Sequence, residues 1–166
     1  MNTDQAKFLA EYLTGLIERE SAMTAKVLEA VPDTGHDYKP DAKSRTAWEL
    51  ATHLATADVW FIDCIAQGKF EFDQEAAKKA EAEFRSVNEI VEFYKKTFPA
   101  KLAVVRALPG DQLSEPIDFF GVMKKTRAEW IGFANNHSVH HRGQLAAYLR
   151  AMGSKVPNIY GPSADA

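Results

Sequence analysis

Two histidines in the last third of the chain, His137 and His141, have a spacing that suits metal binding, and His140 lies beside them. They lie within a helical pattern of apolar residues that runs from about 126 to 152. Because an α-helix turns by about 100° per residue, His141 lies about 40° from His137 on the apolar face. His140 lies about 60° to the other side, at the edge of that face. A buried imidazole needs a partner for each ring nitrogen. For His137 and His141 alone, that partner can be a hydrogen-bonding group or a metal ion that both rings share.

An earlier helical pattern supplies a third imidazole. It begins at a capping box formed by Thr46 and Glu49 and stops at Gly68. His53 lies at the inner edge of its apolar face, where a lone histidine is most often half in water. If the helix faces the one that carries His137 and His141, three nitrogen donors converge, and such a set suits Zn, Ni, Fe or Cu.

Three protein ligands leave coordination positions open for water or substrate, as in catalytic rather than structural metal sites. A metal held in this way lowers the pKa of bound water to about 7. It can equally stabilise the thiolate of a thiol substrate. The sequence shows no serine or cysteine nucleophile with an adjacent base, so no catalytic group is predicted beyond the metal-bound water.

Four further side chains are candidates for contacts around the metal or with substrate. Glu49 precedes His53 by one helical turn and can orient its ring, although closing the capping box is the competing role. Gln144 shares the histidine face and can bind substrate or water, or serve as an amide at the core edge. His140 is a candidate outer base, with a solvent or interface role as the alternative. Tyr160, in the turn-rich tail, can lean over the site or only pack on the body.

The apolar periodicity predicts an all-α four-helix bundle in a single domain, residues 1–166. The expected helices cover about 4–30, 46–66, 86–108 and 126–152. The charged connection 68–85 is long, which predicts a crossover between the second and third helices that lets them lie parallel. Pro99 should kink or break the third helix. The apolar segment 111–124 should fold over the bundle end, and no stretch shows a strand pattern.

Composition narrows the classes of partner. The formal net charge of −3 argues against nucleic acid as a main partner. The single cysteine, Cys64, allows no internal disulfide and indicates a reducing compartment. The first residues do not resemble a signal peptide, and no apolar run approaches the roughly 18 residues of a membrane span. We therefore expect a soluble cytoplasmic protein with no membrane partner.

Three stretches carry a resemblance to a known family: TAWELATHLATADVWF around His53, NHSVHHRGQLAAYLRAMG, and VPNIYGPSAD near the end. Together they resemble the DinB family of YfiT-like metal-dependent proteins, over nearly the whole chain. The resemblance implies a four-helix bundle with a long crossover. It also implies a metal triad of one histidine from the second helix and two from the fourth, which here are His53, His137 and His141. A divalent transition metal, Zn or Ni before others, and a homodimer are implied as well.

The resemblance implies a class of function but no single reaction. Some relatives are thiol-dependent S-transferases or isomerases that use bacillithiol, mycothiol or glutathione, and others resemble metal-dependent hydrolases. The first hypothesis is therefore a metal-dependent enzyme that transfers a thiol to, or hydrolyses, a small-molecule substrate. A non-catalytic metal or small-ligand binding protein is the alternative. A structural helical partner protein, suggested by Phe119 and Phe120, is the third.

Overall fold

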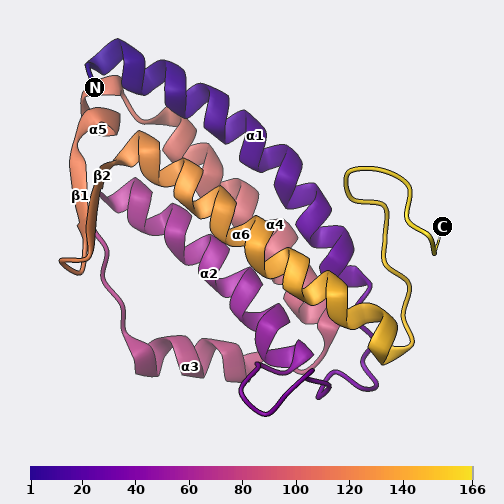
Figure 1. Ribbon diagram of the computed structural model, residues 1–166. Coiled ribbons are helices and arrows are strands. Elements are labelled where there is room, and N and C mark those ends of the chain that lie inside the picture. Colours follow the sequence, from indigo (N-terminus) through magenta and orange to yellow (C-terminus); the bar gives the residue numbers. More distant parts are fainter. Residues whose placement is uncertain (166) are drawn as a thin grey trace.

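The computed structural model describes residues 1–165 and has four long helices packed as a bundle (Figure 1). They are α1 (Thr3–Glu29), α2 (Ala47–Gln67), α4 (Val87–Ala107) and α6 (Arg127–Leu149), and α6 continues into the short 3₁₀ turn η1 (Arg150–Met152). The predicted all-α four-helix bundle is confirmed. Among the described residues, no helix is both long and apolar enough to cross a membrane.

The order of the helices around the bundle follows from their contacts. α6 packs against α1 and α2, and α4 packs against the same two helices from the opposite side. α2 and α4 run parallel, as the pairs Asp58–Tyr94 and Asp63–Lys101 show. The crossover between them carries a short exposed helix, α3 (Gln74–Glu83), which runs back along the bundle (Figure 1). The predicted long crossover between the second and third long helices is therefore confirmed.

Local capping sets where the long helices begin and end. Thr46 and Glu49 exchange the two hydrogen bonds of a capping box at the start of α2, and Thr126 and Glu129 do so at the start of α6. Gly68 ends α2 in the left-handed conformation that glycine adopts without steric cost (φ 79°). The expected break at Pro99 is wrong, because α4 runs through this residue without interruption.

The segment after α4 corrects the prediction that no strands occur. A short helix, α5 (Gly110–Ser114), is followed by the antiparallel hairpin β1 (Pro116–Phe119) and β2 (Met123–Thr126). Phe120 and Gly121 form its turn, both with positive φ (50° and 73°). Each strand has only four residues, which is too short for an alternating pattern to stand out in the sequence. As predicted, the segment folds over the end of the bundle (Figure 1).

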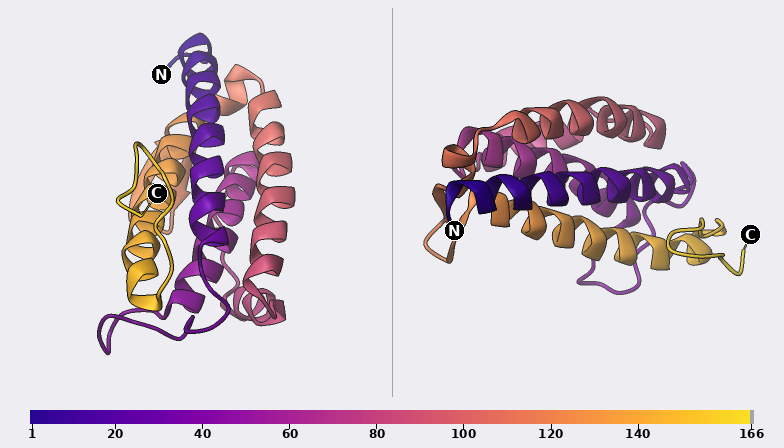
Figure 2. Two further views of the ribbon diagram at one scale, coloured as in Figure 1. Left: turned by 90° about the vertical axis from the view of Figure 1, so that its right-hand side faces the viewer. Right: turned by 90° about the horizontal axis from the view of Figure 1, so that it is seen from above.

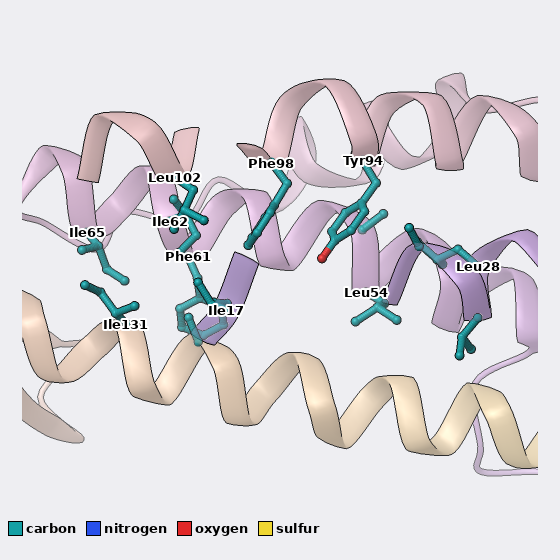
Figure 3. Close-up of a cluster of buried hydrophobic side chains, with 14 of the residues drawn as sticks. Ile17, Leu28, Leu54, Phe61, Ile62, Ile65, Tyr94, Phe98, Leu102 and Ile131 are labelled. Atoms are coloured by element: carbon teal, nitrogen blue, oxygen red, sulfur yellow. The ribbon is translucent and has the colours of Figure 1, made fainter. Parts of the chain in front are cut away.

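The core lies between the four long helices (Figure 3). Apolar side chains from all four meet there, and those labelled in the figure are Ile17, Leu28, Leu54, Phe61, Ile62, Ile65, Tyr94, Phe98, Leu102 and Ile131. Beyond η1, the tail folds back beside α1 and α6 (Figure 2). Ser154 donates a hydrogen bond to the carbonyl of Ala30 (2.6 Å), so the start of the tail is held against the end of α1.

Candidate metal centre

α2 and α6 bring His53, His137 and His141 together. The ring centre of His53 lies 5.4 Å from that of His137 and 4.8 Å from that of His141. The ring centres of His137 and His141 are 4.4 Å apart. One ring nitrogen from each residue can be chosen so that all three lie within 4.8 Å of one another. The residues that the sequence singled out as a possible ligand set therefore form one cluster.

The cluster forms because α2 and α6 are antiparallel neighbours (Figure 1), and the ring of His53 on α2 lies close to those of His137 and His141 on α6. His137 and His141 are one turn apart on α6 and point the same way. All three side chains are partly exposed, so the seam is accessible from solvent. Imidazoles bound to one tetrahedral ion have ring centres about 5 Å apart, which is close to the spacing observed here, and the three residues therefore fit a shared ion.

The electrostatic surroundings keep the rings of His53 and His141 neutral, which is the form that binds metal. Burial, together with smaller contributions from the positive charge of Arg45 and from the neighbouring histidines, lowers the pKa of His53 to about 3. Burial also lowers the pKa of His141 to about 4, against a hydrogen bond to Gln144 that raises it. Both rings therefore offer a free lone pair at neutral pH without first losing a proton.

Gln144 is one of the predicted outer contacts that the structure brings to the cluster. Its Oε1 lies 2.8 Å from Nδ1 of His141. Because an amide oxygen can only accept a hydrogen bond, Nδ1 must carry the ring proton in this arrangement. The lone pair of His141 is then on Nε2, which is the nitrogen left for a metal.

The remaining predicted contacts lie elsewhere. The carboxylate of Glu49 accepts a hydrogen bond from the backbone of Thr46 (2.8 Å), so it closes the capping box and does not orient His53. His140 is exposed, with its ring centre 5.0 Å from that of His141 at the rim of the cluster. Of the two roles left open for Tyr160, the structure shows contact with the body of the bundle and not a position over the cluster. Its hydroxyl contacts Glu20 on α1, because a buried cation on the other side of α6 needs acceptors there.

Asp58 is the residue near the cluster that the sequence interpretation missed. Its carboxylate is 2% exposed, and its Oδ1 lies 3.7 Å from Nδ1 of His137. Burial raises the pKa of this carboxyl group, against hydrogen bonds from its neighbours that lower it. A signal was present in the sequence: Asp58 falls about 140° from His53 on α2, between Leu54 and Ile62 on the apolar face. An acidic residue at such a position needs a polar partner.

Aromatic rings flank the cluster on one side. The ring centre of Phe61 lies 5.0 Å from that of His137, and Phe133 and Phe119 continue this wall towards the hairpin. Phe61 itself is buried. Such a wall excludes water on that side and strengthens electrostatic interactions within the cluster.

Geometry and fold together define a class: a four-helix-bundle protein with an open three-histidine candidate metal centre on one helix seam. The sequence model of the DinB family matches residues 2–166, and the chain therefore belongs to the DinB family. The uncharacterized protein YjoA of Bacillus subtilis is 28% identical over 134 residues, which are 79% of this chain and 82% of YjoA.

Solved structures share the fold. The structure of YjoA, a DinB-like protein, is similar with a TM-score of 0.70 at 25% identity, over 90% of this chain and 98% of YjoA. YfiT of Bacillus subtilis is described as a probable metal-dependent hydrolase with an unusual four-helix bundle topology. It is similar with a TM-score of 0.63 at 16% identity, over 91% of this chain and 87% of YfiT. A mycothiol-dependent maleylpyruvate isomerase is similar with a TM-score of 0.57 at 12% identity, over 87% of this chain and 61% of the isomerase.

Proposed function

We propose that this protein is a metal-dependent enzyme in which His53, His137 and His141 hold a divalent transition metal that acts on a small-molecule substrate. One observation carries the proposal: three imidazoles converge on a partly exposed seam, and burial lowers the pKa of two of them, His53 and His141. Among the described residues, no cysteine or carboxylate completes the set to four ligands. Three protein ligands are the pattern of a catalytic site with an open position.

The bound metal would supply a nucleophile at neutral pH, by lowering the pKa of a coordinated water or thiol. The chain itself supplies the surroundings of that chemistry. Gln144 holds the ring of His141 in one tautomer. The aromatic wall beside His137 restricts water on one side, so that a substrate enters from the exposed side of the seam. Zn and Ni both accept three imidazoles, and they are the metals we propose.

The identity of the nucleophile distinguishes two reactions. Water as the nucleophile gives a hydrolase, the description attached to YfiT. A low-molecular-weight thiol gives a thiol S-transferase, and the isomerase of the same fold depends on mycothiol. The alternative is a non-catalytic metal-binding protein. It is favoured by one feature of the described residues: Asp58, whose carboxylate lies 3.7 Å from His137, is buried and therefore not accessible to a substrate.

Elemental analysis of the purified protein beside His53→Ala tests the metal site. The expected result is one equivalent of metal in the parent and none in the variant. His140→Ala is the matched control, because this histidine adjoins His141 but lies outside the cluster, and it should retain the metal. Equal metal content in the parent and His53→Ala would overturn the proposed site.

Turnover tests the catalytic part. The metal-loaded protein is assayed with ester and amide substrates, and with electrophiles in the presence of bacillithiol, mycothiol or glutathione. Activity that disappears on chelation and in His53→Ala supports an enzyme. A metal-loaded protein that is inactive against both panels would favour the binding protein instead.

A further inference from the structure

We propose that Asp58 is a positioning residue that orients His137 and fixes its tautomer, so that this histidine binds the metal through Nε2. The inference rests on the proposed function, because it assumes that the three histidines share a metal. It concerns a side chain that is not itself a ligand and that lies behind the cluster, between α2, α4 and α6. The geometry of its two oxygens carries the argument.

The two oxygens of Asp58 have different surroundings. Oδ2 accepts hydrogen bonds from the hydroxyl groups of Ser138 (2.6 Å) and Tyr94 (3.1 Å). Oδ1 is fully buried and has no hydrogen-bond partner among the described residues. Two neutral donors hold Oδ2 in place, while no hydrogen bond offsets the cost of burying Oδ1. A buried acceptor in this state is costly and calls for a specific explanation.

The atom that faces Oδ1 is in the same state. Nδ1 of His137 lies 3.7 Å away, is equally buried, and also has no partner among the described residues. A hydrogen bond of ordinary length requires the two atoms to approach by only about 0.9 Å. Since a carboxylate can only accept, this bond places the ring proton of His137 on Nδ1. The lone pair is then on Nε2, which is free for the metal.

Asp58 is distinct among the groups that surround the cluster. His141 has the neutral, exposed amide of Gln144 as its partner. No side-chain hydrogen bond of the described residues reaches the ring of His53. Asp58 is therefore the one carboxyl group among the side chains found to face these rings in the described chain. A carboxylate behind a histidine ligand raises its basicity and holds its ring in place, and loss of such a partner typically weakens metal binding by about 10- to 100-fold.

The test is the affinity for Zn²⁺, measured by competition with a chromophoric chelator, in the parent and in Asp58→Ala. We expect the variant to bind Zn²⁺ about 10- to 100-fold more weakly. Ser138→Ala is the matched control, because it removes a buried hydrogen bond to the same carboxylate but leaves Oδ1 facing His137. We expect its affinity to stay within about threefold of the parent, the size of a modest indirect effect. Urea unfolding of each variant establishes that it is folded.

A spectroscopic measurement on the parent does not depend on any variant. In the Zn²⁺-loaded protein, the ¹⁵N chemical shifts of the ring of His137 should report a protonated Nδ1 and a metal-bound Nε2. If Asp58 had only a structural role, it would not determine which ring nitrogen of His137 carries the proton. Coordination through Nδ1 would overturn the inference, as would a folded Asp58→Ala that binds Zn²⁺ within threefold of the parent. A parent that binds no Zn²⁺ at all would overturn the proposed function instead.

Discussion

Two polar clusters lie back to back on α6, and they differ in how completely their polar atoms are paired. His141 faces the seam with α2, and the next residue, Arg142, faces α1. Consecutive residues of a helix point about 100° apart, so adjacent positions serve two different clusters. Arg142 is 1% exposed, while His141 is partly exposed.

The cluster around Arg142 is saturated with hydrogen bonds. Its guanidinium donates to the backbone carbonyl (2.9 Å) and the carboxylate (2.6 Å) of Glu20, and also to the hydroxyl of Tyr160. The hydroxyl of Tyr160 in turn donates to the same carboxylate (2.7 Å). Every partner comes from the protein itself, and together these bonds tie α1, α6 and the tail to one another. This arrangement explains the cluster as part of the fold, with no ligand required.

The histidine cluster is the opposite case. His137 and Asp58 each leave a buried polar atom without a partner among the described residues, and the rings of His53 and His141 are held in their neutral form. Stability alone would favour apolar residues at these positions, since buried polar groups stabilise little even when paired. The comparison indicates that unpaired polar atoms, more than polar residues as such, mark the site of function.

The largest expected effect separates the two clusters by their response to metal. At about a thousandfold excess over its dissociation constant, Zn²⁺ should raise the free energy of unfolding of the parent by about 4 kcal/mol. His137→Ala should abolish this increment, because two imidazoles remain where three are needed. Urea unfolding with and without Zn²⁺ measures it. An equal increment in parent and variant would place the metal elsewhere.

The next effect belongs to the saturated cluster. Arg142→Met should lower the free energy of unfolding by about 3 kcal/mol, because the largely buried carboxylate of Glu20 loses its cation. Its affinity for Zn²⁺ should be unchanged. Arg150→Met is the matched control: the ion pair of Arg150 with Asp165 is exposed, and its loss should cost less than about 1 kcal/mol. Equal losses of unfolding free energy in the two variants would mean that the buried ion pair stabilises the fold no more than the exposed one.

A smaller effect is expected in how the free energy of unfolding of the metal-free protein depends on pH. His53 and His141 have a pKa of about 3 and about 4 when folded, against 6.5 when unfolded, so the unfolded chain binds protons first. The free energy of unfolding should therefore fall as the pH drops below about 6.5 and continue to fall through about 4. Each ring contributes less than about 1.4 kcal/mol per pH unit, because both remain partly solvated.

Urea unfolding of metal-free protein from pH 7 to pH 4 measures this dependence. The double variant His53→Gln, His141→Gln lacks both titrating rings and should show a shallower slope. A parent that keeps its stability down to pH 4 would mean that these rings are solvated in the folded state, like ordinary surface histidines.

The smallest expected effect concerns Gln144, the exposed partner of His141. Gln144→Ala should weaken Zn²⁺ binding only about twofold, equivalent to roughly 0.5 kcal/mol, because water can replace an exposed amide. Competition with a chelator resolves this difference. A loss as large as that expected for Asp58→Ala would mean that charge and burial of the outer partner do not matter.

Local features of the sequence were sufficient for the long helices and for the face that His137 shares with His141. Helical periodicity and capping act over a few residues, so they can be read from Thr46 and Glu49 or from the spacing of two histidines. The helical pattern around His53 offered a third nitrogen donor, the family resemblance implied the same three residues, and the structure brings their rings together.

Tertiary structure alone decided which polar groups became partners. Asp58 and His137 are far apart in the chain, and only the antiparallel packing of α2 against α6 sets them opposite each other. The capping contact of Glu49 is local, whereas the contact of Tyr160 with Glu20 depends on how the tail folds back against α1. A residue's angle on its own helix follows from the sequence, whereas its neighbour across a seam depends on how two helices are positioned along each other.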